Sequence, residues 1–342
     1  MKFSWSIILF PFSIVYGIIT YVRNLCFDLG IFKKFIIPIK SIVVGNLAVG
    51  GTGKTPHVYY ISKLLSEKFD VSVLSRGYGR KSKGYLDVLE NSNSNDVGDE
   101  PLLLKSRLKN QTHIAVCESR KFGVQQLIEK FSTKLVVLDD AFQHRKVKAG
   151  LNILLTEYHR PFFDDYILPM GRLRESIKGK KRADIIIVTK CPDSISKDEK
   201  SFFKEKINLE NIPIFFSTIR YSSFVSFSKK NVSSIESILL VTAIADDTKI
   251  VEYLSKSFSV KTFKFRDHHS FTTDDITKIH LKFDLLPKGN SIILTTEKDF
   301  VKLKEVDEVI NAQYPWFFLP IDIEIDRQEE FNQLLIDYVG TV

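Results

Sequence analysis

The residues best suited to chemistry stand between Ile42 and Thr55, where the sequence reads IVVGNLAVGGTGKT. An apolar run that turns through glycines into Gly-Lys-Thr is typical of a phosphate-binding loop, in which backbone N–H groups surround phosphate oxygens at a helix N-terminus. We expect Lys54 to reach the β- and γ-phosphates and Thr55 to offer its hydroxyl to Mg²⁺. The strict pattern begins with glycine, where this chain has Ala48. A glycine-rich turn without a nucleotide is the alternative. The predicted nucleotide-binding residues are Gly50, Gly51, Thr52, Gly53, Lys54 and Thr55.

Two adjacent acids could complete this site. Asp139 and Asp140 follow the apolar run Leu135–Leu138. Ligands of open α/β sheets bind at the carboxyl ends of the strands, where these acids are expected to lie. After a phosphate-binding loop, one of the two carboxylates is expected to hold Mg²⁺ directly or through water. A simple turn without a metal is the alternative.

Two further segments have the composition for proton transfer. Asp99 and Glu100 begin a Leu-rich helix, and local sequence alone explains them as an N-cap and a first-turn acid. Asp267, His268 and His269 match a carboxylate that orients an imidazole, which is the composition of a general-base pair. A metal site is the alternative for the histidines, although no third ligand stands close by in the sequence.

Arginines follow two predicted turns. Arg76–Arg80 (RGYGR) places two arginines on a glycine turn, which suits a phosphate-bearing substrate; a solvated basic loop is the alternative. Leu168–Glu175 (LPMGRLRE) places Arg172, Arg174 and Glu175 after a Pro/Gly turn. These charges either stabilise a transferring phosphoryl group or form ordinary surface pairs.

The elements that must position these residues alternate along the chain. Short β-like runs occur at Ser41–Val44, Val71–Ser75, His113–Cys117, Leu135–Leu138, Asn152–Thr156 and Asp184–Thr189. Helical patterns fall between or after them, at about 55–68, 99–109, 120–131 and 196–207. Such alternation predicts a mostly parallel sheet with helices on both faces, the P-loop NTPase type of α/β fold.

A second, smaller α/β domain is expected after a Lys- and Ser-rich section near 194–233. Its predicted elements are Ile238–Thr242, a helix at about 247–257, Val260–Phe265, a helix near 273–285, Ile292–Thr295, a strand around Trp316–Ile323 and a helix around Gln328–Tyr338. We therefore predict an N-terminal segment over 1–37, a P-loop kinase domain over 38–215 and a lid domain over 216–342. The last strand and helix are the elements that could pack back on the first domain.

The N-terminus is suited to a membrane. Residues 3–22 carry no charge, and basic residues follow at Arg23, Lys33 and Lys34. A helix of this length spans about 30 Å, the hydrocarbon thickness of a bilayer. Pro11 is expected to kink such a helix near its middle, and Ser6, Ser13, Gly17 and Thr20 form a faint polar stripe. The segment therefore either spans the membrane or lies in its interface, with the enzyme on the cytoplasmic face. A cleaved signal peptide and a buried core helix are the alternatives.

Composition limits the partners. The 342 residues have 44% hydrophobic content and a net charge of +8, which fits a globular protein with an anionic partner. The basic residues are scattered without a nucleic-acid-binding signature, so no nucleic acid is expected. No obligate protein partner is evident. Three distant cysteines indicate a reducing compartment and no disulfide framework.

Three classes of P-loop protein compete at this point. A GTPase switch is disfavoured because no Asn-Lys pair exists to read guanine, and an ABC-type ATPase because the Leu-Ser-Gly-Gly-Gln signature is absent. A membrane-tethered binding or chaperone ATPase stays open. A kinase that acts on a membrane-embedded, phosphorylated acceptor explains more, because it accounts for the N-terminal segment, the basic loops and the second domain.

Seven motifs, in the order of the chain, resemble those of the tetraacyldisaccharide 4′-kinase family, the lipid A 4′-kinases of Gram-negative bacteria. They are VGNLAVGGTGKTP (Val44–Pro56), SRGYGR (Ser75–Arg80), VGDEP (Val97–Pro101), LDDAFQH (Leu138–His144), LPMGRLRE (Leu168–Glu175), DHHSF (Asp267–Phe271) and TTEKD (Thr295–Asp299). The resemblance implies transfer of the ATP γ-phosphate to the 4′-hydroxyl of a tetraacylated glucosamine disaccharide 1-phosphate. It also implies Mg²⁺ and attachment to the cytoplasmic face of the inner membrane.

The resemblance also implies roles for single residues. Asp99 resembles the family's catalytic acid and His268 its partner, although the sequence leaves open whether His268 or His269 forms the pair. The catalytic set expected on this basis is Lys54, Asp99, Arg174 and His268. The expected metal environment comprises Thr55, Asp139, Asp140 and Glu175. The expected substrate contacts are Arg76, Tyr78, Arg80, Gln143 and His144.

Overall fold

The computed structural model describes residues 9–230, 232, 234–287, 289–306, 309 and 313–341. Its larger sheet has nine strands in the order β16-β10-β9-β8-β2-β6-β3-β5-β4. These strands are β2 (Lys40–Asn46), β3 (Val71–Ser75), β4 (Leu86–Asp87), β5 (His113–Val116), β6 (Leu135–Asp139), β8 (Leu151–Glu157), β9 (Ile185–Cys191), β10 (Ile214–Tyr221) and β16 (Ile321–Ile325). All neighbours pair in parallel except the two edge strands, β16 and β4.

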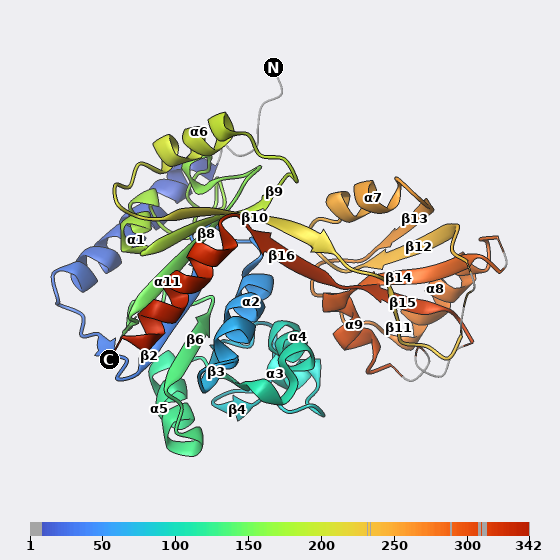
Figure 1. Ribbon diagram of the computed structural model, residues 1–342, viewed down its shortest axis with the longest axis horizontal. Helices are drawn as coiled ribbons and strands as arrows, with labels where there is room; N and C mark the ends of the chain where they lie inside the picture. Colours follow the sequence, from blue (N-terminus) through green and yellow to red (C-terminus); the bar gives the residue numbers. More distant parts are fainter. Residues whose placement is uncertain are drawn as a thin grey trace.

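Helices cover both faces of this sheet (Figure 1). Side chains alternate between the faces of a strand, so Ile42 and Val44 of β2 pack in one core while Val43 packs in the other. The first core holds residues of α2 (Lys54–Ser66), α4 (Asp99–Leu108) and α11 (Gln328–Gly340). The second holds residues of α5 (Arg120–Phe131) and α6 (Lys197–Ile207). The predicted fold class, a mostly parallel sheet between two helical layers, is confirmed.

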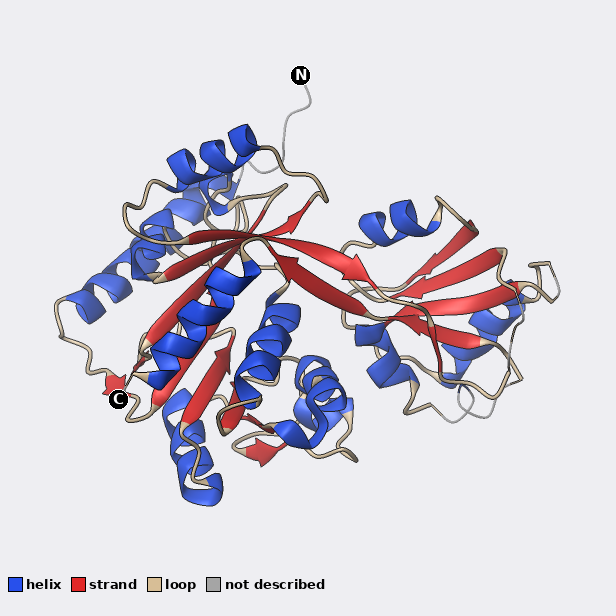
Figure 2. Cartoon of the chain, in the orientation of Figure 1, coloured by secondary structure: helices blue, strands red, loops and turns tan. Residues whose placement is uncertain are grey.

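A second sheet of five strands lies beside the first, in the order β11-β15-β14-β12-β13 (Figures 1 and 2). Its strands are β11 (Val225–Ser226), β12 (Ser237–Thr242), β13 (Ser259–Lys264), β14 (Ser291–Thr296) and β15 (Trp316–Leu319). Its helices are α7 (Thr248–Leu254), α8 (Thr273–Phe283) and α9 (Glu297–Leu303). One face packs on α8 and α9 and the other on α7, so this unit also has a core on each face. Smaller elements are α3 (Ser94–Val97) and the parallel pair of β1 (Phe35–Ile36) and β7 (Val147–Lys148).

The final strand differs from the sequence prediction. We expected one strand around Trp316–Ile323, but the chain forms β15 in the second sheet and β16 in the first, with Pro320 between them. Proline has no N–H to donate to a strand ladder, so it separates the two. β16 pairs antiparallel with β10, and two chain connections therefore join the units. The domain boundaries 1–37, 38–215 and 216–342 stay a prediction.

The N-terminal helix α1 (Phe10–Asp28) also differs in detail. Residues 3–8 of the predicted apolar segment, including Ser6 of its polar stripe, lie outside the described residues. Pro11 stands in the first turn of α1, where proline is tolerated, so the expected kink near the middle of the helix is wrong for this helix.

The polar stripe of α1 packs on the protein. Ser13 and Thr20 are buried, and a Cβ added at Gly17 would lie 3.5 Å from Ile167 Cδ1. The other face exposes large apolar side chains: Phe12, Val15, Ile18, Ile19 and Val22. By length and composition α1 could cross a membrane.

Candidate active site

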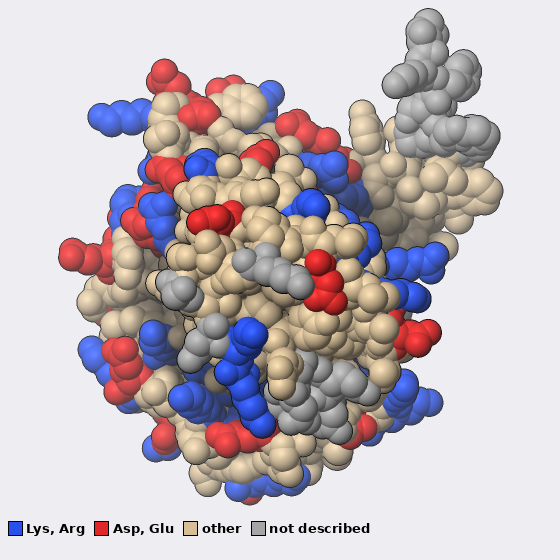
Figure 3. Space-filling view, turned by 90° about the vertical axis from the view of Figure 1, so that its right-hand side faces the viewer, with Lys and Arg blue, Asp and Glu red and all other residues tan. Residues whose placement is uncertain are grey.

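A cavity of about 2300 Å³ opens between the two sheets. The phosphate-binding loop, the acids after β6 and the 76–78 turn line it from the first unit. Asp267, His268 and Lys298 line it from the second. Figure 3 views the molecule from the side of the second unit, where Lys, Arg, Asp and Glu are interspersed without a dominant sign of charge. The chemically suited residues of both units line the one cavity between them.

The phosphate-binding loop has the backbone that its sequence predicts. Gly50 and Gly53 have φ values of 109° and 82°, which glycine adopts without a Cβ clash, and Lys54 begins α2. Asn46 Nδ2 donates to Thr52 Oγ1 at 2.8 Å, which braces the loop against the end of β2. Lys54 is 8% exposed, and its Nζ lies 3.8 Å from Asp140 Oδ1. The loop is thus preformed with its cation at the sheet edge.

The two acids after β6 differ in environment. Asp139 is buried: its Oδ2 accepts from Ser75 Oγ at 3.0 Å, while Oδ1 has no hydrogen-bond partner among the described residues. Burial, and then the Glu100 and Asp140 charges, raise the pKa of Asp139. Burial also opposes ionisation of Asp140, but the Lys54 and Arg174 charges lower its pKa. An unpartnered buried carboxylate oxygen at this edge fits a bound cation.

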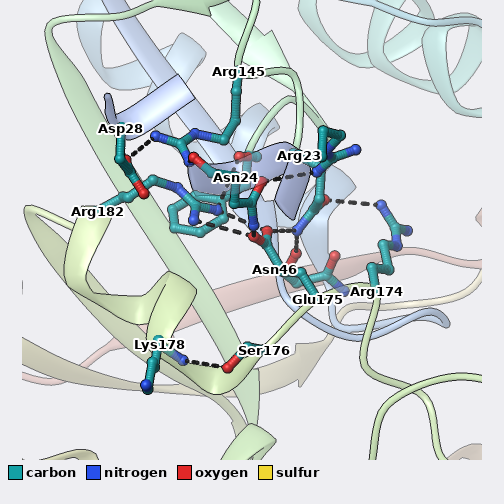
Figure 4. Close-up of polar contacts among 12 residues, drawn as sticks. Arg23, Asn24, Asp28, Asn46, Arg145, Arg174, Glu175, Ser176, Lys178 and Arg182 are labelled. Carbon is teal, nitrogen blue, oxygen red and sulfur yellow. Dashed lines mark hydrogen bonds and ion pairs between the residues drawn. The ribbon is translucent and has the colours of Figure 1, made fainter. Parts of the chain in front are cut away.

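Glu175, which we expected to help bind the metal, is placed elsewhere. It is fully buried, and its carboxylate accepts from Arg182 at 2.7 Å, Asn24 at 2.6 Å and Gln143 at 3.1 Å (Figure 4). These donors occupy both oxygens, so the expectation of a metal ligand is wrong for this arrangement. Arg174, the neighbouring residue, does face the cavity and donates to Asp140 Oδ1 at 2.9 Å.

Asp99 and His268 meet across the two units. His268 Nδ1 lies 2.9 Å from Asp99 Oδ2, although 169 residues separate them. Lys298 Nζ lies 3.2 Å from the other ring nitrogen, Nε2, so that the imidazole donates from Nδ1 to Asp99 and accepts at Nε2. The hydrogen bond to Asp99 raises the pKa of His268, against burial and the Lys298 charge. Burial works against the ionised form of Asp99, but its bond to His268 and the Lys298 charge hold its pKa below the ordinary value.

The adjacent histidine has other contacts. His269 Nε2 lies 2.8 Å from Asp275 Oδ2, and its ring stacks on Phe265. Of the two histidines, the structure pairs His268 with Asp99, which the sequence left open.

The expected substrate contacts divide into two groups. Arg76, Tyr78, Gln143 and His144 line the cavity. Arg80 does not; its guanidinium donates to Glu118 Oε1 and to Gly84 O, both at 2.6 Å, and braces its own loop. The substrate role expected for Arg80 is therefore not supported by its placement. Burial and the Arg120 charge lower the pKa of His144 to about 4, so this side chain is neutral at pH 7.

Comparison with known proteins agrees with this geometry. The family model described as Tetraacyldisaccharide-1-P 4′-kinase matches residues 5–340. The chain belongs to that family. It is 42% identical to the tetraacyldisaccharide 4′-kinase of Bacteroides fragilis strain YCH46, covering 97% of this chain and 92% of that protein. It is also 42% identical to the enzyme of that name from Flavobacterium psychrophilum, covering 97% and 96%. The family resemblance drawn from the motifs is confirmed.

A solved structure gives the same result for the fold. The crystal structure of LpxK from Aquifex aeolicus in complex with ATP superposes with a TM-score of 0.77 at 30% identity, covering 98% of this chain and 100% of that one.

Several residues around this kinase-family site were not predicted from the sequence. Arg120 is 2% exposed and donates to Asp139 O at 3.1 Å, and burial lowers its pKa to about 10. Lys298 stands in the TTEKD motif, which signalled the segment but not its contact with His268. Asn24, on the apolar N-terminal helix, carried no signal except that it is a polar residue beside a hydrophobic run.

Proposed function

We propose that this chain transfers the γ-phosphate of ATP to the 4′-hydroxyl of a tetraacylated glucosamine disaccharide 1-phosphate, a step of lipid A biosynthesis. The observation that carries the proposal is that Lys54 and His268, from different units of the chain, line one cavity. Phosphoryl transfer to an alcohol uses a cation that binds the phosphates and a group that accepts the proton of the hydroxyl, and these two residues supply both.

Lys54 and the backbone of the loop would hold the β- and γ-phosphates in line with the acceptor. Arg174, whose guanidinium lies 2.9 Å from Asp140, would balance charge on the transferring group. Thr55 and the unpartnered Asp139 oxygen would hold Mg²⁺, with Asp140 beside them. When bound, Mg²⁺ would neutralise charge that develops on the phosphate oxygens.

The Asp99–His268 pair would take the proton of the 4′-hydroxyl, or orient that hydroxyl for attack. His268 lines the cavity, and Asp99 lies behind it at 6% exposure. A buried carboxylate that accepts from Nδ1 stabilises the imidazolium that forms when Nε2 gains a proton. Lys298 Nζ lies within hydrogen-bond distance of Nε2 in this arrangement. It would have to move away before the acceptor hydroxyl could donate its proton to Nε2.

We infer that the lipid reaches the cavity along α1, from the cytoplasmic face of the inner membrane. Phe27, Ile31 and Phe32 line the cavity next to Arg23 and Lys33. Apolar side chains beside cations match the acyl chains and phosphate of the acceptor. The exposed apolar face of α1 would then contact the bilayer.

The test is an assay of γ-³²P transfer from ATP to the tetraacylated disaccharide 1-phosphate in detergent micelles with Mg²⁺. We expect labelled lipid that depends on Lys54 and His268. ATP hydrolysis without labelled lipid would instead favour the alternative, a membrane-tethered ATPase that acts as a binding or chaperone module.

A further inference from the structure

The segment that carries Arg174 lies between helix α1 and the phosphate-binding loop. On the loop side, Val49 N donates to Arg172 O at 2.8 Å, and Arg174 N donates to Leu47 O at 2.7 Å. On the helix side, the Tyr16 hydroxyl donates to Arg174 O at 3.0 Å. The backbone of Arg174 is therefore held by α1 and by the loop that precedes Lys54.

A second connection runs through side chains, of which Figure 4 shows Asn24, Glu175 and Asn46. Asn24 Nδ2 of α1 donates to Glu175 Oε2 at 2.6 Å. Gln143 Nε2 donates to Glu175 Oε1 at 3.1 Å and to Asn46 O at 2.7 Å. Glu175 is fully buried, so its position is fixed by these donors and by Arg182. This network joins α1 to the end of β2, where the phosphate-binding loop begins.

The guanidinium of Arg174 completes the path. It donates to both carboxylate oxygens of Asp140, at 2.9 and 3.1 Å, and Asp140 lies 3.8 Å from Lys54 Nζ. The path from Tyr16 to Lys54 therefore consists of the hydrogen bond to the Arg174 backbone, the Arg174 side chain, its hydrogen bonds to Asp140 and the ion pair between Asp140 and Lys54. The opposite face of the same helix exposes Phe12, Val15 and Ile19.

We propose that α1 is a positioning element of the phosphate site as well as a membrane-facing helix. Tyr16 and Asn24 hold Arg174 where it can contact the transferring phosphoryl group, so the seating of α1 and the placement of Arg174 are coupled. This inference rests on the proposed function, because it assumes that Arg174 acts in phosphoryl transfer. Tyr16 and Asn24 are positioning residues, since they act through Arg174 and Glu175.

The test compares Tyr16→Phe and Asn24→Ala with wild type, using ATP, Mg²⁺ and the tetraacylated disaccharide 1-phosphate. Loss of one hydrogen bond that orients a transition-state group is expected to lower kcat about three- to tenfold, with both KM values within about twofold of wild type. Sedimentation with phosphatidylethanolamine/phosphatidylglycerol vesicles is expected to be unchanged, because the exposed face of α1 is intact. In an Arg174→Ala background neither change is expected to lower kcat further.

Tyr166→Phe is the matched control, because Tyr166 lies in the same loop and is 63% exposed. It is expected to keep the wild-type kcat. The inference fails if both α1 variants keep full kcat, if their losses multiply with that of Arg174→Ala, or if vesicle binding falls in step with kcat. A wild-type protein that transfers no phosphate to the lipid refutes the proposed function itself, whatever the variants do.

Discussion

The two halves of the candidate site are built differently. The phosphate half combines Lys54, at the start of α2 after β2, with Asp139, at the end of β6, and β2 and β6 pair directly in one sheet. The proton-accepting half joins Asp99, at the start of α4, to His268, which follows β13 of the other sheet. One half belongs to a continuous structure, and the other exists only while the two units are docked.

The contacts that dock the units are both polar and apolar, because Val301 of α9 is buried in the core that α2 and α4 also form. Ser94 N and Oγ donate to the Glu305 carboxylate at 2.8 and 3.0 Å, and Arg107 lies 3.5 Å from Glu297. Interfaces between domains of one chain resemble transient protein–protein interfaces, and relative motion of the domains is expected unless the interface is large and hydrophobic. We infer that ATP can bind to the phosphate half in an open arrangement, whereas phosphoryl transfer requires the docked one. The following predictions test that separation, from the largest expected effect to the smallest.

Lys54→Ala is expected to have the largest effect, because it removes the cation that faces the transferred phosphate. The rate of phosphate transfer to lipid should fall about 10³-fold, and ATP affinity should fall with it. Lys63→Ala is the control, since Lys63 lies on the same helix but is exposed. Near-normal transfer by Lys54→Ala would contradict the kinase proposal.

His268→Ala is expected to lower transfer about 10²- to 10³-fold, the usual contribution of a general base, while the Kd for ATP stays within about twofold. His269→Ala is the matched neighbour: its ring is bonded to Asp275, so transfer should fall no more than about threefold. Equal losses in the two variants, or loss of ATP binding in His268→Ala, would remove the distinction between the two halves.

The phosphate half could be predicted from sequence because its signals are local. Gly50–Thr55 specify a turn, and the run Leu135–Leu138 specifies the buried strand that brings Asp139 to its edge. The proton half could not be assembled from the residues alone. Asp99 is explained adequately as a helix-terminal acid, and only the resemblance to the family joined it to His268.

Two sequence predictions were wrong for different reasons. Glu175 lies three positions after Arg172 in a charged motif, but its hydrogen-bond partners come from α1, from Gln143 and from Arg182. A local sequence pattern does not predict contacts with residues that are distant in the sequence. The expected kink at Pro11 was wrong because the apolar run does not mark where the helix begins, and α1 begins at Phe10.

Asp139→Asn and Glu175→Gln test which acid belongs to the metal site. Asp139 Oδ1, which has no hydrogen-bond partner within the described part of the chain, predicts that the Mg²⁺ concentration for half-maximal transfer rises about tenfold or more in Asp139→Asn. The fully bonded Glu175 carboxylate predicts a Mg²⁺ requirement within about twofold of wild type in Glu175→Gln, even if the variant is less stable. Titration of activity with Mg²⁺ at saturating ATP measures both. A large shift in Glu175→Gln would restore the metal role expected from its sequence.

The smallest predicted effect concerns the acid limb of the pH profile. Transfer requires neutral His268, so the rate should fall as the pH falls through the pKa of His268. That pKa is raised by the hydrogen bond to Asp99 and opposed by burial and by the charge of Lys298. The groups facing the imidazole are Asp99, Lys298, Asp267 and the ring of Tyr78, with Lys302 behind Asp99.

Lys298→Met removes a cation that disfavours the imidazolium, so the pKa of His268 rises and the acid limb of kcat moves to higher pH, by about half to one pH unit. Asp99→Asn removes the hydrogen bond that raises the pKa of His268 most, so the acid limb should move to lower pH. The kcat at the plateau should also be much lower. Lys304→Met, at the C-cap of the same helix α9, is the control and should leave the limb in place. Opposite shifts in the two variants tie the limb to the imidazole that joins the units, because groups of the phosphate half would not respond to Lys298. A limb that ignores Lys298→Met, or moves to lower pH, would mean that another group titrates and that the docked pair does not accept the proton.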